Sequence, residues 1–441
     1  MNVLILGLGQ YPHGSGIEAA VFFAEQGVNL IVTDLKLKED LKDNVQRLSK
    51  YKNIQFILGE HRLKDVAWAD IVVPNPRVRP DSQFFQEAVR LGKRIESDVS
   101  LFLEQCPAPV IGVTGTRGKS TTSTLIAEML KADGRTVHLG GNILVSPLAF
   151  LSKVKKTDWV VLELSSWQLE LTGRKGVSPP YAVWTNLMRD HLNTYSGMEE
   201  YGEAKAQIFR HQTGDGLVLL PADKTFIHYA QSAPGEVVRV GGPKDEASKL
   251  VEQTELRLPG EHNRQNAAFA VALCLEIGVK KTVIKKVLTT FTGLPNRLEE
   301  IATINGVKYI NDTTATTPDA TIAALNAFTP SFKESRSALH LIFGGADKEL
   351  EFEEIASLLK KKKPFVYLLP GTAHEKIVTT FKKARVSYLE VKDLADAFAS
   401  IDQEKKIGDI VLLSPGCASF GLFKNEFDRG EVFVRLVRAL T

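Results

Sequence analysis

The chain has 441 residues, 44% hydrophobic and 24% charged, which is a normal composition for a globular protein of roughly two to four domains. A formal net charge of +3 is small for this length and does not indicate a nucleic-acid binder. No stretch approaches the roughly 20 apolar residues of a membrane span, and the start MNVLILGLG lacks the basic flank of a signal peptide. The three cysteines form no CxxC pair, which predicts free thiols in a reducing compartment. We therefore expect a cytoplasmic protein with no nucleic-acid or membrane partner.

Residues 1–105 alternate short apolar strands with helices, which predicts a parallel α/β domain. Gly7 and Gly9 begin a dinucleotide-like turn after the first strand, but Pro12 occupies the place of the third glycine of GxGxxG. Asp34 ends the second strand, where an acid often meets a ribose. The broken fingerprint is weak evidence for NAD. It favours some nucleotide at this crevice, and the alternative is a close-packed turn without a ligand.

The segment VIGVTGTRGKSTTSTLIAEM opens a second domain after a Pro-rich link near Cys106. It reads as an apolar strand, a glycine turn and an amphipathic helix, the order that a phosphate cradle needs. Lys119 can reach the outer phosphates, and the Ser120 hydroxyl can bind Mg²⁺. Val113 stands where the general P-loop pattern has its first glycine, so a chance Gly/Ser/Thr-rich turn is the alternative. The order of strand, GKS and helix favours a P-loop.

Polar residues follow the later strands of this domain. Glu163 ends the strand of DWVVLELSSWQLE, where an acid commonly orients Mg²⁺, although it could instead cap the next helix. His191 and Lys205 follow another buried strand, and either residue taken alone would more often be structural. Asn263 and Asn266 stand before an apolar helix, as N-cap residues or as ligand contacts.

Residues 249–259 read as strand and loop, and from Leu294 the α/β pattern restarts as a third domain with a parallel sheet. Glycines flank the ends of two of its strands, at Gly344-Gly345 and Pro415-Gly416, which places loops at the carboxyl edge where such sheets bind ligands. The lysine run at 360–363 reads as a solvated helix end. The predicted domains are 1–105, 106–295 and 296–441.

Five segments of the central domain resemble, in order and spacing, motifs of the Mur ligase family, the ATP-dependent amino-acid-adding enzymes of peptidoglycan synthesis. They are TGTRGKST, LELSSWQLE, TNLMRDHL, YGEAKAQIF and GEHNRQNAA. The resemblance spans the whole chain. It implies a Rossmann-like N-terminal domain for a UDP substrate, a P-loop ATPase-like central domain and a Rossmann-like C-terminal domain for the amino acid. The segments ELSSWQLE, LPNR, INDTTAT, FGGADK and SPGCASFGLFKN resemble those of members that add D-glutamate to UDP-N-acetylmuramoyl-L-alanine through an acyl phosphate.

The resemblance also implies a role for each matched residue. The catalytic residues would be Lys119, His191 and Lys205. ATP and its phosphates would be bound by Gly115, Thr116, Gly118, Lys119, Ser120, Thr121, Asn263, Asn266, Arg297 and Asp312. Mg²⁺ would be held by Ser120, Glu163, His191 and Lys205, the last as a carbamate, because an ammonium would repel the metal. The UDP-muramoyl substrate would meet Asn142, Ser165 and Gln168, and the incoming glutamate Thr316, Lys348 and Ser419.

The sequence departs from the family pattern at several places. Arg117 replaces the usual asparagine of GTNGK, YPHGSG extends the first glycine loop, and Arg77 replaces a glycine. Thr314 occupies the lysine position of NDSKAT, and Glu426 falls where an aromatic residue is frequent. The last two leave the identity and stereochemistry of the added amino acid open. A related ligase adding another amino acid such as L-glutamate, or a nucleotide-binding module without chemistry, remain the alternatives to a monomeric D-glutamate ligase.

Overall fold

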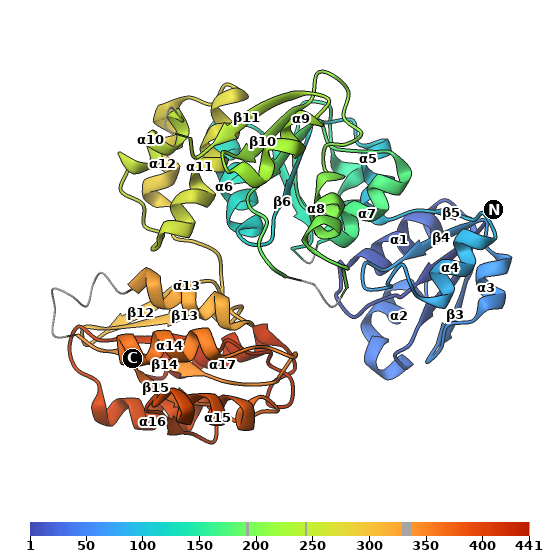
Figure 1. Ribbon diagram of the computed structural model, residues 1–441. Helices are drawn as coiled ribbons and strands as arrows, with labels where there is room; N and C mark the ends of the chain where they lie inside the picture. The colour runs from blue at the N-terminus through green and yellow to red at the C-terminus, as the bar shows by residue number, and fades with distance from the viewer. Residues whose placement is uncertain (144, 191–193, 243–244, 329–336, 441) are drawn as a thin grey trace. The chain divides into compact units, whose positions relative to one another are not determined.

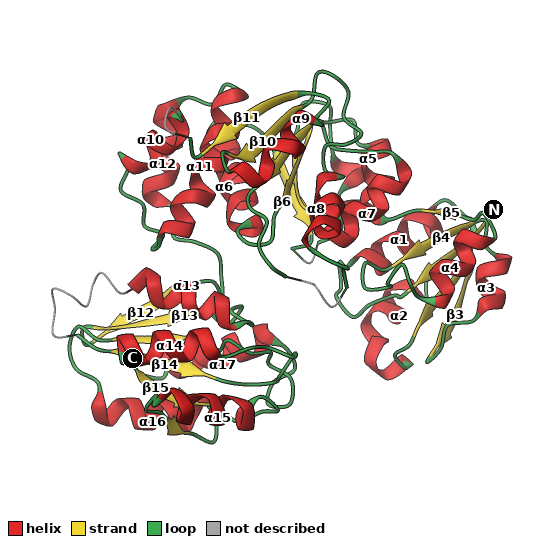
Figure 2. Ribbon diagram, in the orientation of Figure 1, coloured by secondary structure: helices red, strands yellow, loops and turns green. Residues whose placement is uncertain are grey.

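The computed structural model describes residues 1–143, 145–190, 194–242, 245–328 and 337–440. The chain divides into two compact units, one formed by residues 1–255 and 265–289 and the other by residues 256–264 and 290–441. The first unit contains two sheets and the second unit one, each flanked by helices (Figures 1 and 2). The predicted α/β class is therefore confirmed. The domain boundaries at 105/106 and 295/296 stay predictions.

The N-terminal sheet is parallel throughout, with the strand order β3-β2-β1-β4-β5. Its strands are β1 (Asn2–Leu6), β2 (Asn29–Asp34), β3 (Ile54–Leu58), β4 (Ile71–Pro74) and β5 (Arg94–Ile95). Its helices are α1 (Ser15–Glu25), η1 (Lys38–Leu41), α2 (Lys42–Leu48), α3 (Leu63–Trp68) and α4 (Gln83–Arg90). Val3 and Ile5 pack toward α1, whereas Leu4 and Leu6 pack toward α3 and α4, as the two-residue period of a strand requires. The strand order reverses beside β1, so the loops after β1 and β4 border the crevice where such sheets bind ligands.

The central sheet is also parallel, with the order β11-β10-β9-β6-β8-β7. Its strands are β6 (Val110–Thr114), β7 (Val137–Gly141), β8 (Trp159–Glu163), β9 (Tyr181–Trp184), β10 (Leu217–Pro221) and β11 (Glu236–Val240). Its helices are α5 (Asp98–Gln105), α6 (Lys119–Ala132), η2 (Pro147–Ala149), η3 (Leu151–Lys153), α7 (Ser166–Lys175), α8 (Met198–Ala206), η4 (Lys224–Phe226), α9 (Ile227–Gln231), α10 (Glu246–Glu252), α11 (Glu261–Glu276) and α12 (Lys281–Thr290). One cluster of buried apolar side chains continues from α1 through α5 to this sheet, so both sheets of the first unit share a core.

The sheet of the second unit has the order β12-β13-β17-β14-β15-β16 and is parallel except for the antiparallel pair β12-β13. Its strands are β12 (Glu299–Ile304), β13 (Val307–Asn311), β14 (Leu339–Phe343), β15 (Phe365–Leu368), β16 (Leu389–Glu390) and β17 (Ile410–Leu413). Its helices are α13 (Pro318–Phe328), α14 (Glu353–Lys362), α15 (His374–Ala384), α16 (Leu394–Glu404) and α17 (Glu426–Arg438). The first three helices pack on one face of the sheet and the last two on the other. The sequence analysis predicted a domain of parallel type and did not predict β12, the antiparallel strand of this sheet.

One local prediction was wrong, and for Asn263 and Asn266 the structure excludes the capping alternative. The segment read as strand and loop from residue 249 begins inside α10, whose N-terminus is capped by the Asp245 side chain accepting from Ala247 N at 2.9 Å. Helix α11 begins at Glu261, so Asn263 and Asn266 lie within its first two turns and do not cap it. Among the described residues, none of the helices combines the length and hydropathy that crossing a membrane requires.

Candidate active site

The predicted phosphate cradle lies between β6 and α6, at the carboxyl edge of the central sheet. Gly118 has a left-handed φ of +80° and caps α6, so the helix N-terminus opens directly into the loop. A Cβ atom on Gly118 would come within 1.9 Å of Asn266 Oδ1, and one on Gly115 within 2.0 Å of Thr185 Oγ1. Both positions therefore need glycine, and the loop is closely packed against two other segments of the unit. Asn266, predicted to contact ATP, lies beside this loop.

Two residues after β9 hold the cradle in shape. Asn186 accepts from Arg117 N at 2.9 Å through Oδ1 and donates to Arg117 O at 3.0 Å through Nδ2. The Thr185 hydroxyl donates to the same carbonyl at 2.7 Å. These bonds fix the backbone at Arg117, the position where the family has asparagine. The sequence prediction missed both residues, although two polar residues directly after a buried strand were a usable signal.

Two lysines donate to one carbonyl of the cradle. Lys119 Nζ lies 3.0 Å from Gly115 O and 3.1 Å from Thr116 O. Lys205 Nζ, from α8, lies 3.0 Å from Gly115 O and is only 1% exposed. Burial, together with the nearby charge of Lys119, lowers the pKa of Lys205 to about 6, although the charge of Asp190 opposes the shift. At neutral pH the Lys205 side chain is therefore mainly a neutral amine.

Glu163 ends β8 and carries a buried carboxylate beside the cradle strand. Its Oε1 accepts from Asn142 Nδ2 at 2.9 Å, and its backbone oxygen accepts from Asn142 N at 2.8 Å. Its Oε2 is buried without a hydrogen-bond partner among the described residues. A buried carboxylate oxygen in this state is costly unless a donor or a cation satisfies it. His191, predicted to bind metal, lies outside the described residues, and elsewhere in the described chain no three His, Cys, Asp or Glu side chains gather as a metal site.

Ser165 and Gln168 form a capping box at the start of α7. Ser165 Oγ accepts from Gln168 N at 3.3 Å, and Gln168 Oε1 accepts from Ser165 N at 3.0 Å. The Gln168 side chain is buried, whereas Asn142 is exposed. The motif ELSSWQLE thus fixes the start of this helix, and a substrate role for the pair stays a prediction.

The second unit places Asp312 directly after β13. Its Oδ2 accepts from Ser414 Oγ at 2.8 Å and its Oδ1 from Leu298 N at 3.2 Å. Burial raises the pKa of Asp312 to about 7, although both hydrogen bonds and the nearby charge of Arg297 oppose the rise. The predicted ATP contacts Arg297 and Asp312 are therefore electrostatic neighbours.

This raised pKa predicts a pH-dependent gain in stability for Asp312→Asn. Between about pH 4 and pH 7 the folded state retains a proton that the unfolded state releases, so stability falls as the pH rises through this range. A buried amide does not pay the free-energy cost of ionisation. The free energy of unfolding of Asp312→Asn should therefore exceed that of the wild type by up to about 4 kcal/mol at pH 8, and should not exceed it below pH 4. Amide hydrogen exchange of β13 and β17 in the full chain, measured at pH 5 and pH 8, checks this. An equal difference at both pH values would contradict it.

The residues predicted to bind glutamate lie on loops of this unit. Lys348 Nζ lies 5.6 Å from the ring centroid of Phe420, which is 58% exposed, and the neighbouring Ser419 is buried. Thr316 N donates to Thr314 O at 2.9 Å, so this loop is a tight turn. Lys348 and Ser419 therefore come from neighbouring loops of the carboxyl edge, which the bridge between Ala346 and Ala418 joins.

The two departures in the predicted amino-acid site have structural partners. Thr314 Oγ1 donates to Asn296 O at 2.9 Å, and Glu426 begins α17, its backbone oxygen accepting from Thr313 Oγ1 at 2.8 Å. Arg429, which the sequence analysis did not single out, is buried and joins these loops. Its guanidinium donates to Thr313 O at 2.8 Å and to Cys417 O at 3.2 Å. Asn263, also in this unit, donates to Pro259 O at 2.8 Å.

Comparison with known proteins places this geometry in a family. A family model described as Mur ligase middle domain matches residues 113–274, and one described as Mur ligase, glutamate ligase domain matches residues 296–417. A UDP-N-acetylmuramoylalanine--D-glutamate ligase of Roseiflexus sp. (strain RS-1) is 38% identical, covering 100% of this chain and 99% of its own. The ligase of the same name from Borreliella afzelii (strain PKo) is 34% identical, covering 100% and 98%.

Solved structures share the fold at lower identity. The UDP-N-acetylmuramate-alanine ligase of Thermotoga maritima has a TM-score of 0.62 at 19% identity, covering 100% of both chains. The MurF ligase of the same organism, solved in complex with ADP, has a TM-score of 0.60 at 17% identity, covering 94% of this chain and 96% of its own. Together with the family models and the full-length relatives, these likenesses show that the chain belongs to the Mur ligase family.

Proposed function

We propose that the chain adds D-glutamate to UDP-N-acetylmuramoyl-L-alanine with the hydrolysis of ATP, as a step of peptidoglycan synthesis. The observation that carries this proposal is the full-length similarity to relatives named UDP-N-acetylmuramoylalanine--D-glutamate ligase. The chain is an enzyme of the ligase class, and its own residues supply what this reaction needs. We further propose that it acts as a monomer in the cytoplasm, without nucleic-acid or membrane partners.

The cradle after β6 is the site proposed for ATP. Backbone N–H groups around Gly115 and Gly118 would close on the phosphates, with the start of α6 adding positive potential. Lys119, which donates to the carbonyls of Gly115 and Thr116, would bind the outer phosphates in their place. The cradle has the chemistry of a triphosphate site, and the solved MurF ligase of the same fold is in complex with ADP. Arg297 and Asp312, which belong to the second unit, are also proposed as ATP contacts.

The residues beside the cradle fit Mg²⁺. Glu163 Oε2 is an acceptor without a partner among the described residues, and Ser120 occupies the first turn of α6, where a P-loop hydroxyl meets the metal. Lys205 would join these ligands as a carbamate, for which a neutral, buried amine is the required precursor. His191 is proposed as a further ligand. Bound Mg²⁺ would neutralise phosphate charge as a carboxylate approaches.

The chemistry proposed for this site has two steps. The carboxylate of the muramoyl-alanine attacks the γ-phosphorus of ATP, giving an acyl phosphate and ADP. The amine of glutamate then attacks the acyl carbon and forms the C–N bond. The bond between the acyl carbon and the phosphate oxygen breaks, inorganic phosphate leaves, and the amine nitrogen loses a proton. Lys119 and Arg297 would stabilise the negative charge that gathers in the first step. Lys348, Thr316 and Ser419 would hold the glutamate, whose two carboxylates suit a lysine and hydroxyls.

A ligation assay tests the proposal directly. The chain is incubated with UDP-N-acetylmuramoyl-L-alanine, ATP and Mg²⁺, and D-glutamate, L-glutamate and other amino acids are offered one at a time. Phosphate release and product mass are recorded. Product with D-glutamate alone would support the proposal. Product with L-glutamate instead would retain the mechanism and assign the altered choice to Thr314 and Glu426, whereas no amino-acid-dependent phosphate release would overturn the proposal.

A further inference from the structure

A buried carboxylate lies where the two sheets of the first unit meet. Asp98, the first residue of α5, is 1% exposed, and its Oδ2 accepts from Ser146 Oγ at 2.7 Å. Its Oδ1 is buried without a hydrogen-bond partner among the described residues. Burial raises the pKa of Asp98, while the Ser146 and Ser15 hydroxyls oppose the rise. Burying a carboxylate costs stability unless donors satisfy it, and the Ser146 hydroxyl is the donor that links Asp98 to the loops of this region.

Ser146 joins this carboxylate to two loops. The bridge between Gly141 and Val145, with Gly141 N donating to Val145 O at 2.7 Å, closes the turn after β7 directly before Ser146. Ser146 N donates to His13 O at 2.7 Å, in the glycine loop after β1. One residue therefore ties the loop of Asn142 to the first glycine loop, and Asp98 fixes its side chain.

The first glycine loop is held from the other side by α2. Asn44 Nδ2 donates to Gly9 O at 2.7 Å, and Arg47 Nη1 donates to Pro12 O at 2.7 Å. The Oε1 atom of the buried Glu18 lies 2.7 Å from Arg47 Nη1 and 2.8 Å from His13 Nδ1. The YPHGSG extension, a departure from the family pattern, is thus an ordered loop clamped between α2 and Ser146.

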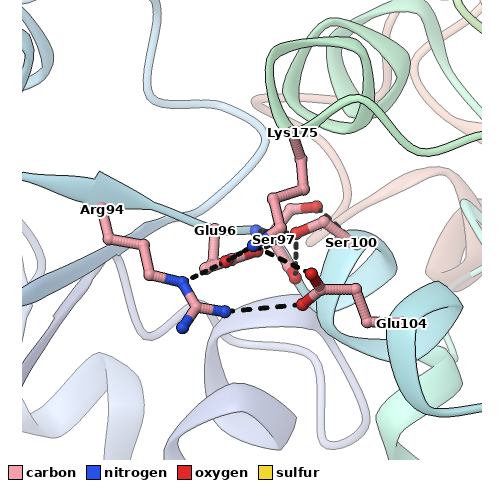
Figure 3. A network of polar contacts seen from close by, with 6 residues as sticks. All are labelled: Arg94, Glu96, Ser97, Ser100, Glu104 and Lys175. Carbon is pink, nitrogen blue, oxygen red and sulfur yellow. Dashed lines mark hydrogen bonds and ion pairs between the residues drawn. The ribbon is translucent and has the colours of Figure 1, made fainter. Parts of the chain in front are cut away.

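The start of α5, which carries Asp98, is fixed by two sets of polar contacts. Ser97 and Ser100 form a capping box: Ser97 Oγ accepts from Ser100 N at 2.9 Å, and Ser100 Oγ accepts from Ser97 N at 2.7 Å. Figure 3 shows the second anchor, where the buried Glu96 accepts from Lys175 of α7 at 2.7 Å and from Ser100 Oγ at 2.7 Å. Arg94 and Glu104 complete this network around Lys175 and Glu96. These contacts fix the position of the start of α5, so we expect it to stay in place when a ligand binds to the loops.

We propose that Asp98 is a positioning residue for the nucleoside-diphosphate sugar. Through Ser146 it holds the loop after β7 against the loop after β1, so that Asn142 and the first glycine loop present one preformed wall to that substrate. The role rests on the proposed function, because it needs a substrate that touches both loops. It is distinct from the cradle of Lys119, which receives ATP.

The test separates substrate binding from turnover in Asp98→Ala, Asp98→Asn and Ser146→Ala. Kinetics are measured for each substrate, and the affinity for UDP-N-acetylmuramoyl-L-alanine without ATP is measured by calorimetry. Asp98→Ala should raise both KM and Kd for this nucleotide sugar about 10-fold or more, because a loose loop must be ordered on binding. The KM for ATP and kcat should change much less than this, since the loop of Lys119 meets the loop of Asn142 only through Glu163 among the contacts described above. Asp98→Asn should remain close to wild type, because its amide oxygen can still accept from Ser146.

Asp65→Ala is the matched control. Asp65 is also buried in the same domain, but its carboxylate accepts from Arg62, directly before α3, at 2.8 and 2.9 Å. This variant should lose stability without a change in nucleotide-sugar affinity. If Asp98→Ala fails to fold, Ser146→Ala carries the test with the same expected shift. A folded Asp98→Ala or Ser146→Ala with unchanged Kd, or an equal change in all substrate constants, would overturn the proposal. A wild-type chain that binds no nucleotide sugar would instead overturn the proposed function, and this role with it.

Discussion

Replacing Lys119 with alanine is expected to lower kcat about 1,000-fold or more, because the chain loses the cation at the first residue of α6. Removing one preorganised donor to a developing negative charge typically lowers kcat 100- to 1,000-fold, which corresponds to about 3–4 kcal/mol of transition-state stabilisation. Lys119 carries a full positive charge in addition. Its Nζ already lies at the mouth of the cradle, 3.0 Å from Gly115 O. The measurement is amino-acid-dependent phosphate release at saturating ATP.

The control for this variant is Lys131→Ala on the same helix. Lys131 is 47% exposed and pairs with Glu128 at 2.8 Å, so its loss should leave turnover unchanged. Thermal unfolding of both variants establishes that they remain folded. A folded Lys119→Ala enzyme with near wild-type kcat would refute both the ATP site and the mechanism built on it.

Replacing Lys205 with alanine is expected to lower kcat about 100-fold or more, because the variant cannot form an anionic metal ligand. The neutral amine of Lys205 can attack carbon dioxide, forming an N–C bond and releasing one proton, whereas an ammonium cannot. Its pKa of about 6, which burial lowers, keeps the amine neutral at the pH of the assay. Turnover should therefore also fall when carbon dioxide is removed from the buffer.

The carbamate has a signature that is independent of activity. Wild-type chain equilibrated with carbon-13 bicarbonate should show one slowly exchanging carbamate resonance, and Lys205→Ala should lack it. Lys249→Ala, at an exposed position of α10, should retain both the resonance and the activity. A wild-type chain without the resonance, or a Lys205→Ala chain with normal turnover, would contradict this prediction.

The strand ends of the two parallel sheets could be predicted from sequence because burial on both faces gives continuous apolar runs, as in Val110–Thr114 and Trp159–Glu163. Lys119 and Glu163 were predictable for the same reason, since each directly follows or ends such a run. The antiparallel strand β12 was missed although its signal is readable. Asn305 and Gly306 both have positive φ and turn β12 into β13, the pattern typical of a two-residue hairpin.

The contribution of Asp98 could not be predicted from sequence. Its burial depends on Ser146 and on the loop of His13, which are 48 and 85 residues away along the chain, and no local period encodes that meeting. Helix α10 was missed because its sequence, EASKLVE, is short and charged, and its strongest signal is the cap at Asp245. Long-range packing and single capping side chains are therefore the parts of this structure that a sequence pattern conveys least.

The outer strands of the sheets have a consequence for self-association. The N-terminal sheet ends at β5, which is Arg94–Ile95, and the sheet of the second unit ends at β16, which is Leu389–Glu390. A strand of another molecule could pair with only two residues at β5 or at β16, whereas an ordinary strand has about five or six. One of the two residues is charged in each case, which further disfavours such pairing. The opposite edge in the second unit, β12, carries a bulge between Glu300 and Ala302. At these three edges the chain should therefore resist the edge-to-edge strand pairing that leads open sheets to aggregate.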